Sequence, residues 1–196
     1  DPCLKKIAID PSLLRLGENV LHLCILYEET DGLEAIFLTG DFGVKVEGGS
    51  ARITAAPEKL EFGDWCGQGL PFYGAGVNYR FRVKSDPPDG ERVLLKAPAF
   101  EGAMARVLVD GEQAGFILWP PYELDITEYN KGKKEIEIGF ELISSRRNTF
   151  GPLHQKHEPW AVGPGNFVTE GDDWSDAYVL KPCGLMEPPV LSYQRV

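Results

Sequence analysis

The 196-residue sequence lacks the marks of several large protein classes. It has no apolar run of about 18 residues, the length that a membrane-spanning helix needs. No charged and then apolar leader opens the segment, so we expect no signal peptide within it. Basic residues are outnumbered, with 20 Lys and Arg against 30 Asp and Glu and a net charge of −10. Because an acidic surface repels phosphate backbones, we expect a soluble protein that binds neither nucleic acid nor a membrane.

Cysteine is scarce and widely spaced. The four cysteines are Cys3, Cys24, Cys66 and Cys183. None forms the C-x-x-C pair that is typical of zinc clusters, and four are too few for a disulfide scaffold of this length. Cys24 lies in an apolar run, which predicts a buried, small hydrophobic side chain. The cysteines leave the compartment open, and the absence of an N-x-S/T sequon is consistent with a bacterial origin.

Helical periodicity is also missing, whereas turn-forming residues are abundant. The chain holds 22 glycines and 15 prolines, and no dozen residues keep an apolar stripe at helical spacing without one of them. Short runs with a period of two are common instead. The predicted strands are Val20–Tyr27, Glu34–Leu38, Tyr79–Val83, Arg92–Leu95, Arg106–Val109, Phe116–Leu118 and Glu135–Leu142.

The clearest hairpin is predicted over 106–118, where Asp110 and Gly111 separate two β-rich runs. An Asp-Gly pair tolerates the positive φ angles that a tight hairpin turn requires. Strands at roughly ten-residue spacing predict an all-β fold of the β-sandwich or jelly-roll type.

The sequence contains an internal repeat. Ile9–Leu23 aligns with Leu124–Ile138 at an offset of 115 positions (Asp10 to Asp125). Each copy has an aliphatic residue, an Asp, a Ser or Thr two positions later, a Gly seven positions after the Asp, and then an alternating run. The Asp and the Ser or Thr can cap a single helical turn that the Gly ends. We therefore expect residues 1–50 to be the closing part of a preceding, related β-sandwich, or extra strands on the main one, and 51–196 to form the main sandwich, with a seam near 47–50.

A series of motifs in the second half resembles the galactose-binding-like β-sandwich modules of large bacterial glycoside hydrolases. Gln68–Tyr73 continuing to Tyr79 resembles the opening strand of that family, and Val107–Gly115 its V-x-V-N-G-x-x-x-G hairpin, with Asp110 in place of Asn. Leu124–Thr127 with Gly132 and Glu135–Ile138 resembles its D-I-T…G-x-N-x-I-x-I segment, with Lys134 in place of Asn.

The C-terminal part continues this resemblance. Arg147-Asn148, Gly151-Pro152, His154 and Tyr178–Leu185 resemble the corresponding region of family-2-like or rhamnosidase-like hydrolases. The likeness covers about residues 60 to 190. It implies a non-catalytic, ancillary module of a carbohydrate-active enzyme, and it does not by itself imply that the module binds sugar.

Two polar and aromatic segments are candidates for carbohydrate binding. Sugar recognition requires aromatic faces and planar hydrogen-bonding groups on a concave surface. The candidate residues are Trp65, Gln68, Tyr73, Arg147, Asn148, His154 and Trp160. The alternative is structural: the aromatic residues fill the core or a seam, and the polar ones hydrogen-bond to the backbone of a long loop.

Metal binding and catalysis have weaker signals. His154-x-x-His157 followed by Glu158 has a spacing seen in zinc sites, but Pro152 and Pro159 disfavour the helix that would align both rings. The resemblance implies no cofactor beyond a structural Ca²⁺, for which Asp172, Asp173 and Asp176, or Asp41 and Asp64, are candidate donors. Glycoside hydrolysis requires two facing carboxylates, and the sequence identifies no such pair among its acidic residues.

The sequence thus leaves three functions open. In the first, an ancillary module binds carbohydrate through the residues named above. In the second, the module is a brace that docks onto the catalytic domain of the same polypeptide and exposes a hydrophobic patch when isolated. In the third, this chain is itself a glycoside hydrolase.

Overall fold

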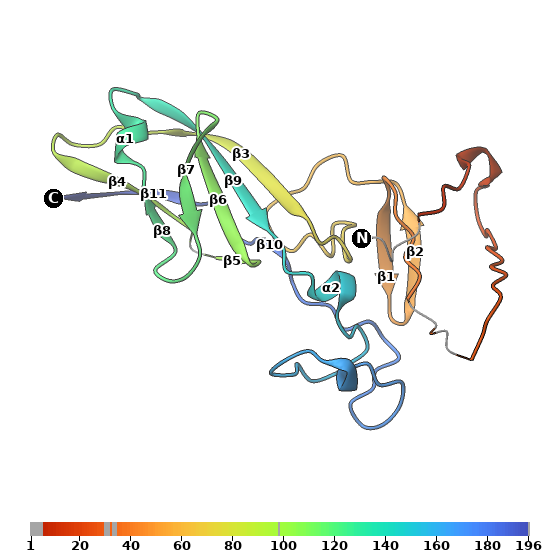
Figure 1. Cartoon of the computed structure of the whole chain (residues 1–196). Coiled ribbons are helices and arrows are strands. Elements are labelled where there is room, and N and C mark those ends of the chain that lie inside the picture. The colour runs from red at the N-terminus through yellow and green to blue at the C-terminus, as the bar shows by residue number, and fades with distance from the viewer. Residues whose placement is uncertain (1–5, 30–31, 33–34, 98, 196) are drawn as a thin grey trace. The chain divides into compact units, whose positions relative to one another are not determined.

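The computed structural model describes residues 6–29, 32, 35–97 and 99–195. By its internal contacts the chain divides into two units, 1–39 and 40–196. Among the described residues, the first unit holds one 3-10 turn, η1 (Pro11–Leu13), and the second holds the strands (Figure 1). The helices of the second unit are the four-residue α1 (Thr127–Asn130) and α2 (Arg147–Phe150) and the 3-10 turn η2 (Pro164–Asn166). The predicted all-β class is therefore confirmed. None of the described helices has the length and apolar character needed to cross a membrane.

A four-stranded antiparallel sheet forms the larger layer. Its order is β3 (Gly76–Lys84), β9 (Glu135–Ile143), β6 (Met104–Val109) and β7 (Glu112–Ile117). The interior strand β9 pairs with β3 on one edge and with β6 on the other. Its even-numbered residues, Ile136, Ile138, Phe140 and Leu142, are buried, because alternate side chains of a strand point to the same face.

A three-stranded sheet forms the second layer. Its order is β11 (Val190–Arg195), β4 (Glu91–Lys96) and β8 (Glu123–Asp125). Val93 and Leu95 of β4 share one hydrophobic core with the buried side chains of β9 and β6. Two sheets that enclose one core have the arrangement of a β-sandwich. Two small sheets complete the fold: β10 (Gly184–Leu185) with β5 (Phe100–Glu101), and β1 (Gly43–Glu47) with β2 (Ser50–Thr54).

The predicted hairpin at Asp110-Gly111 is confirmed as the β6–β7 turn. Both residues have positive φ angles, 51° and 84°. The Asp110 carboxylate accepts a hydrogen bond from the Glu137 N–H (2.8 Å) and forms an ion pair with Lys133 (2.7 Å). One side chain therefore fixes the hairpin to the beginning of β9.

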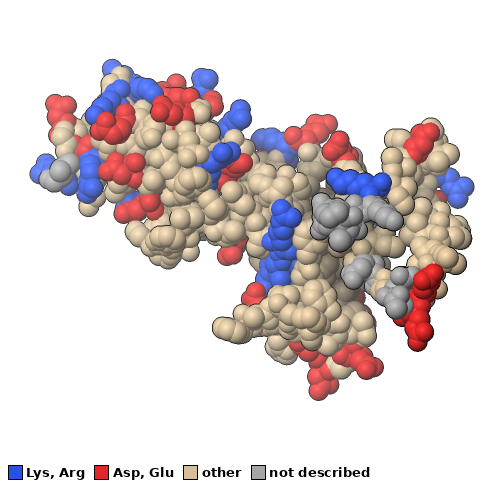
Figure 2. Space-filling model, viewed as in Figure 1, with Lys and Arg blue, Asp and Glu red and all other residues tan. Residues whose placement is uncertain are grey.

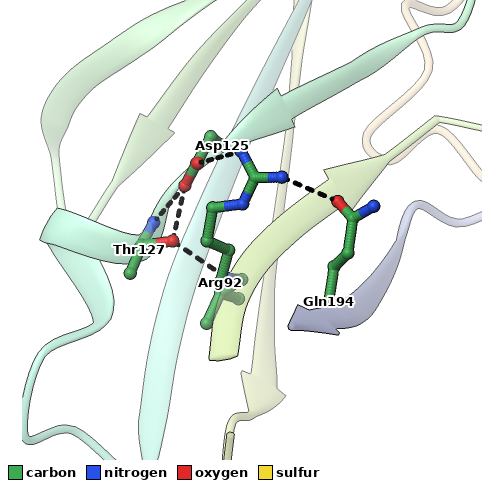
Figure 3. Close-up of polar contacts among 5 residues, drawn as sticks. Arg92, Asp125, Thr127 and Gln194 are labelled. Atoms are coloured by element: carbon green, nitrogen blue, oxygen red, sulfur yellow. Dashed lines mark hydrogen bonds and ion pairs between the residues drawn. The ribbon is translucent and has the colours of Figure 1, made fainter. Parts of the chain in front are cut away.

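The turn that precedes β9 begins at Asp125. Its Oδ1 accepts hydrogen bonds from the Thr127 N–H (3.0 Å) and the Thr127 hydroxyl (2.5 Å). Figure 3 shows these two bonds between Asp125 and Thr127. The Thr127 Oγ1 in turn accepts from the Val93 N–H of β4 (2.9 Å). Gly132, at φ 71°, ends the turn, and β9 follows. The predicted Asp and Thr pair thus forms the turn before α1 and attaches it to β4, although the N-cap residue of α1 is Ile126, which makes no side-chain cap bond.

Most of the predicted strands are present. Those at 79–83, 92–95, 106–109, 116–118 and 135–142 overlap β3, β4, β6, β7 and β9. Within the described part of the chain, the predicted strand Val20–Tyr27 is not part of any β-ladder. The predicted strand Glu34–Leu38 begins outside the described residues, and its described residues, 35–38, are not part of a β-ladder either. The prediction that Cys24 is buried is wrong: it is exposed, and its segment belongs to no β-ladder of the described residues.

The hairpin β1–β2 was not predicted. Its turn contains the predicted seam at 47–50, and the Tyr178 N–H donates to Gly48 O (2.9 Å). Val44 N–H donates to Gly69 O (2.8 Å). The hairpin therefore packs within the second unit.

Among the glycines that the structure describes, Gly184 is the one where an added Cβ would approach the backbone most closely. At φ 149°, a Cβ there would lie 2.1 Å from the Gly63 carbonyl oxygen. We expect Gly184→Ala to destabilise the chain by at least about 2 kcal/mol in urea unfolding. Gly163→Ala, which meets no atom within 4 Å, is the matched control and should change stability by less than about 1 kcal/mol. Equal effects of the two substitutions would contradict this close approach.

The Asp110 hairpin predicts a pH dependence. The hydrogen bond from the Glu137 N–H, and then Lys133, lower the pKa of Asp110. A lowered folded pKa gives stability that is present above the ordinary carboxyl pKa of about 4 and is lost as the pH falls through the folded value. Asp110→Asn keeps the acceptor oxygen but does not titrate. We therefore expect the urea midpoint to fall less between about pH 4 and 2 in this variant than in the parent; parallel curves would contradict the prediction.

Candidate functional site

The predicted carbohydrate-binding residues lie on three segments of the second unit. Trp65, Gln68 and Tyr73 belong to the loop 63–73, and Arg147 and Asn148 to α2. His154 and Trp160 belong to a long loop, 151–183, which we call the C-terminal loop. Contacts link the first two segments to each other, whereas Trp160 has no described contact with the other candidates.

The loop 63–73 is fixed to the end of the C-terminal loop. The Gly63 and Trp65 N–H groups donate to Leu185 O and Cys183 O, both at 2.8 Å. Asp64 Oδ1 accepts from the N–H groups of Cys66 (2.9 Å) and Cys183 (3.0 Å).

This attachment places the Trp65 side chain in the core. It is only 1% exposed, and the ring of Tyr73 contacts it edge-on at a centroid distance of 6.2 Å. In this structure Trp65 therefore contributes to packing and presents no face to a ligand. Tyr73 is partly exposed, and its hydroxyl donates to Gly76 O (3.3 Å).

The Gln68 amide closes its own loop. Its Oε1 accepts from the Glu61 N–H (2.8 Å), and its Nε2 donates to Glu61 O and Asp64 O, both at 3.2 Å. Because both ends of the amide are hydrogen-bonded to the backbone, a ligand could bind this amide only by replacing those bonds.

Asn148 joins α2 to the C-terminal loop. Its Oδ1 accepts from the Lys181 N–H (2.9 Å), and its Nδ2 donates to Lys181 O (2.8 Å) and to Cys66 Sγ (3.3 Å). The side chain pairs with one peptide unit as a neighbouring strand would. Asn148 is 7% exposed, so these bonds satisfy backbone groups that are shielded from water.

The neighbouring Cys66 is a neutral thiol. Burial, assisted by the hydrogen bond and the charge of Asp64, raises the pKa of Cys66 to about 12. Burial likewise raises the pKa of Cys183. Nucleophilic cysteines require a lowered pKa, so this pair has a structural rather than a catalytic environment.

Arg147 differs from the other polar candidates. Its Nε and Nη1 atoms are buried without a hydrogen-bond partner among the described residues. Burial lowers the pKa of Arg147, and the negative charge of Glu158 opposes this shift. Glu158 is itself ion-paired with Lys181. The guanidinium is thus the polar candidate that keeps unused donors.

His154 lies within a stack of aromatic rings. Its Nδ1 lies 2.9 Å from Ser175 O and is the donor of this hydrogen bond, because a carbonyl oxygen can only accept. The ring stacks on Trp174 (4.7 Å, 25°) and contacts Tyr178 (4.7 Å), which in turn contacts Phe72 (5.4 Å). Ring packing therefore holds the two branches of the C-terminal loop together.

The two histidines of the His154-x-x-His157 motif do not converge. His157 Nδ1 bonds to Asp173 (2.8 Å), whereas His154 bonds to Ser175. Of the candidate Ca²⁺ donors, Asp64 accepts from backbone N–H groups and Asp176 from the Trp174 indole (2.9 Å). Within the described ranges, no three His, Cys, Asp or Glu side chains come close enough together to hold a metal ion.

The outer part of the C-terminal loop is apolar and exposed. Trp160 is completely exposed, and Val162, Phe167 and Val168 also present apolar surface to solvent. We call these four residues the apolar rim. On the face shown in Figure 2, uncharged side chains cover much of this loop, whereas basic and acidic side chains alternate over the sandwich strands.

Five carboxyl groups of the described chain have surroundings opposite to those that a glycosidase acid requires. Such an acid requires a raised pKa and a second carboxylate across the sugar. In the described part of the chain, hydrogen-bond donors or cations lower the pKa of each carboxyl group that departs from its ordinary range. These groups are Asp10, Glu47, Asp110, Asp125 and Asp173.

Some residues that build the site have no signal in the sequence. Lys181 takes part through its peptide unit, which any residue could supply, and it lies 33 positions from Asn148. Asp64 is one of many acidic residues, and only the fold shows that it joins two backbone segments.

Comparison with known proteins finds no matching family model and no matching curated protein. Among solved structures, the chain is similar to a rhamnosidase from Novosphingobium sp. PP1Y, with 20% identity and a TM-score of 0.43, over 86% of this chain and 16% of that one. It is also similar to a β-D-glucuronidase of Dictyoglomus thermophilum, with 14% identity and a TM-score of 0.36, over 80% of this chain and 27% of that one. The chain thus spans less than a third of either protein. Because both TM-scores are below 0.5, these similarities do not assign a fold or a function to the chain.

The pairing of Asn148 predicts a structural cost. Asn148→Ala leaves the Lys181 N–H without its partner and the Lys181 carbonyl oxygen with only the weak thiol donor of Cys66, so we expect a loss of about 2–3 kcal/mol in urea unfolding. Trp160→Ala, at an exposed position of the same loop, should stay within about 0.5 kcal/mol. A neutral Asn148→Ala variant would show that this side chain is available for a ligand.

Proposed function

We propose that this chain is a non-catalytic, ancillary module of galactose-binding-like type from a bacterial glycoside hydrolase. In this proposal the module is a brace, and its apolar rim docks onto the catalytic domain of the same polypeptide. The single observation that carries the docking function is the contrast within the candidate site: most polar candidates bind the protein's own backbone, whereas the apolar rim is exposed.

The ordered motifs support the module type. The hairpin motif forms β6 and β7, the D-I-T motif forms the turn at Asp125, and the run after Gly132 forms the interior strand β9. The closing motif 178–185 ends in β10, and its Cys183 and Leu185 carbonyls accept the hydrogen bonds from the loop 63–73. Each motif therefore has a definite structural role in one sandwich.

The polar candidates favour a brace over a sugar site. A lectin-like surface needs donors and acceptors that are free to exchange water for hydroxyl groups. Gln68, Asn148 and the Nδ1 atom of His154 already have backbone partners at 2.8–3.2 Å. Replacing these bonds by bonds to a ligand would leave backbone groups unpaired, at about 1–3 kcal/mol each.

The composition of the rim favours a protein partner. Val162 and Val168 are aliphatic and branched, and they stand with Trp160 and Phe167 on one loop. Aliphatic surface gains from contact with other apolar protein surface, whereas sugar recognition uses flat aromatic rings beside polar groups. Acidic side chains around the loop limit its association with other acidic surfaces, including a second copy of this chain.

Carbohydrate binding is the second candidate, and Arg147 favours it. Its buried Nε and Nη1 atoms have no partner among the described residues, and the nearby carboxylate Glu158 lies two positions before the exposed Trp160. A guanidinium and an indole are groups that bind a sugar. In this alternative Arg147 and Trp160 act together, and the other candidates position them.

Hydroxyl-radical footprinting distinguishes these functions. In the polypeptide that the native gene encodes, we expect Trp160 to be oxidised at least about fivefold more slowly than in the 196-residue chain, because docking covers the rim. Trp119, exposed on the sandwich, is the matched control and should not change.

Two results would contradict the brace. Trp160 could be oxidised equally in both proteins, which would show that nothing covers the rim. Alternatively, the 196-residue chain could bind plant or host oligosaccharides in calorimetric titration with an affinity that Trp160→Ala abolishes, which would assign the rim to carbohydrate. Turnover of aryl glycosides by the 196-residue chain would contradict the non-catalytic assignment.

A further inference from the structure

The two copies of the internal repeat adopt the same local turn. Asp10 Oδ1 accepts from the Ser12 N–H at 2.9 Å, as Asp125 Oδ1 accepts from the Thr127 N–H at 3.0 Å. A single helical turn follows in each copy, η1 in the first and α1 in the second. Gly132, at φ 71°, follows the C-cap of α1 directly, whereas η1 ends at the extended Leu14 and Gly17, at φ 93°, lies three positions further on. The two copies therefore share the Asp turn, the short helical segment and a later glycine at positive φ.

The segments after the two turns differ sharply in their surroundings. In the second copy, β9 is paired on both edges and its alternate side chains are buried. In the first copy, 20–27 is outside every β-ladder of the described chain. The repeat offset of 115 aligns Leu21, Leu23, Ile25 and Tyr27 with the buried Ile136, Ile138, Phe140 and Leu142. The first four side chains are 60%, 50%, 65% and 57% exposed.

Such an alternation is unstable as a free strand. Four large apolar side chains on one face, between two edges of unpaired backbone groups, favour pairing with other strands. The second copy shows what covers this face: a strand on each edge, and a second sheet opposite, where Val93 binds the hydroxyl of the turn. Ser12 is the equivalent of Thr127 and has the hydroxyl that can accept the same bond.

We propose that residues 20–27 are the interior strand of a second β-sandwich, and that Leu21, Leu23, Ile25 and Tyr27 complete its core. The partner is an antiparallel sheet that lacks one interior strand. In the second copy β3, β4 and β6 all precede the turn, so the same order places the partner sheet on the N-terminal side of Ile9 in the same polypeptide. This inference is independent of the docking function proposed above.

Amide hydrogen exchange tests the pairing. In the polypeptide that the native gene encodes, we expect the amides of 20–27 to exchange at least about 1,000-fold more slowly than in an unstructured chain. In the 196-residue chain they should exchange within about tenfold of the unstructured rate. Fast exchange in both proteins would overturn the proposal. Slow exchange in the 196-residue chain that depends on concentration, with a doubled mass in light scattering, would assign the strand to a second copy and would also overturn it.

Matched substitutions test which face is covered. Leu23→Asn places an amide on the face that the repeat assigns to the core, whereas Leu26→Asn changes the opposite face. In the gene-encoded polypeptide we expect Leu23→Asn to lower the melting temperature of the unit that contains this strand by more than about 5 °C, and Leu26→Asn by less than about 2 °C. The reverse order, or equal shifts, would overturn the register. If Leu23→Asn does not fold, the exchange measurement on the parent decides the proposal.

Discussion

The pairing of one strand on both edges organises the second unit. β9 supplies hydrogen bonds to β3 and β6 and sends Ile136, Ile138, Phe140 and Leu142 into the core. Because the side-chain period of a strand is two, this register leaves no freedom to the neighbouring strands: a shift by one position would move every buried side chain to the other face. The turn at Asp125 and the hairpin at Asp110 both lie next to this strand: the first attaches the segment that precedes β9 to β4, and the second binds Glu137 of β9 itself.

The C-terminal loop follows from a different constraint. A long irregular segment has many backbone groups and no ladder to pair them, so side chains must pair them instead. Asn148 does this for the Lys181 peptide unit, and Gln68 and Asp64 do it for the loop 63–73. Most of the polar residues that suggest a binding surface in the sequence therefore hydrogen-bond to the backbone of the C-terminal loop or of the loop 63–73. Of the candidate residues, Trp160 stays fully exposed, together with the apolar side chains of the rim, and our proposal of a docking function rests on this contrast.

The sequence predicts the elements that depend on neighbouring residues, and it does not predict the contacts that depend on residues far apart in the chain. β9, β6 and the Asp110 turn depend on neighbours in the chain, namely alternation and positive φ, and these are visible in the residues. The burial of Trp65 and the pairing of Asn148 depend on Cys183 and Lys181, which lie more than 30 positions away and leave no local pattern. The strand Val20–Tyr27 shows the opposite case. Its pattern is as strong as that of β9, but a strand requires a partner, and the described chain supplies none.

A strand with this alternation is stable only when both of its edges and its apolar face are covered. The decisive measurement is an experimental structure of the polypeptide that the native gene encodes. We expect Leu23 and Ile25 to be buried there between two antiparallel strands, in the register that Ile138 and Phe140 have in β9. A structure in which residues 20–27 remain solvated and unpaired would contradict it.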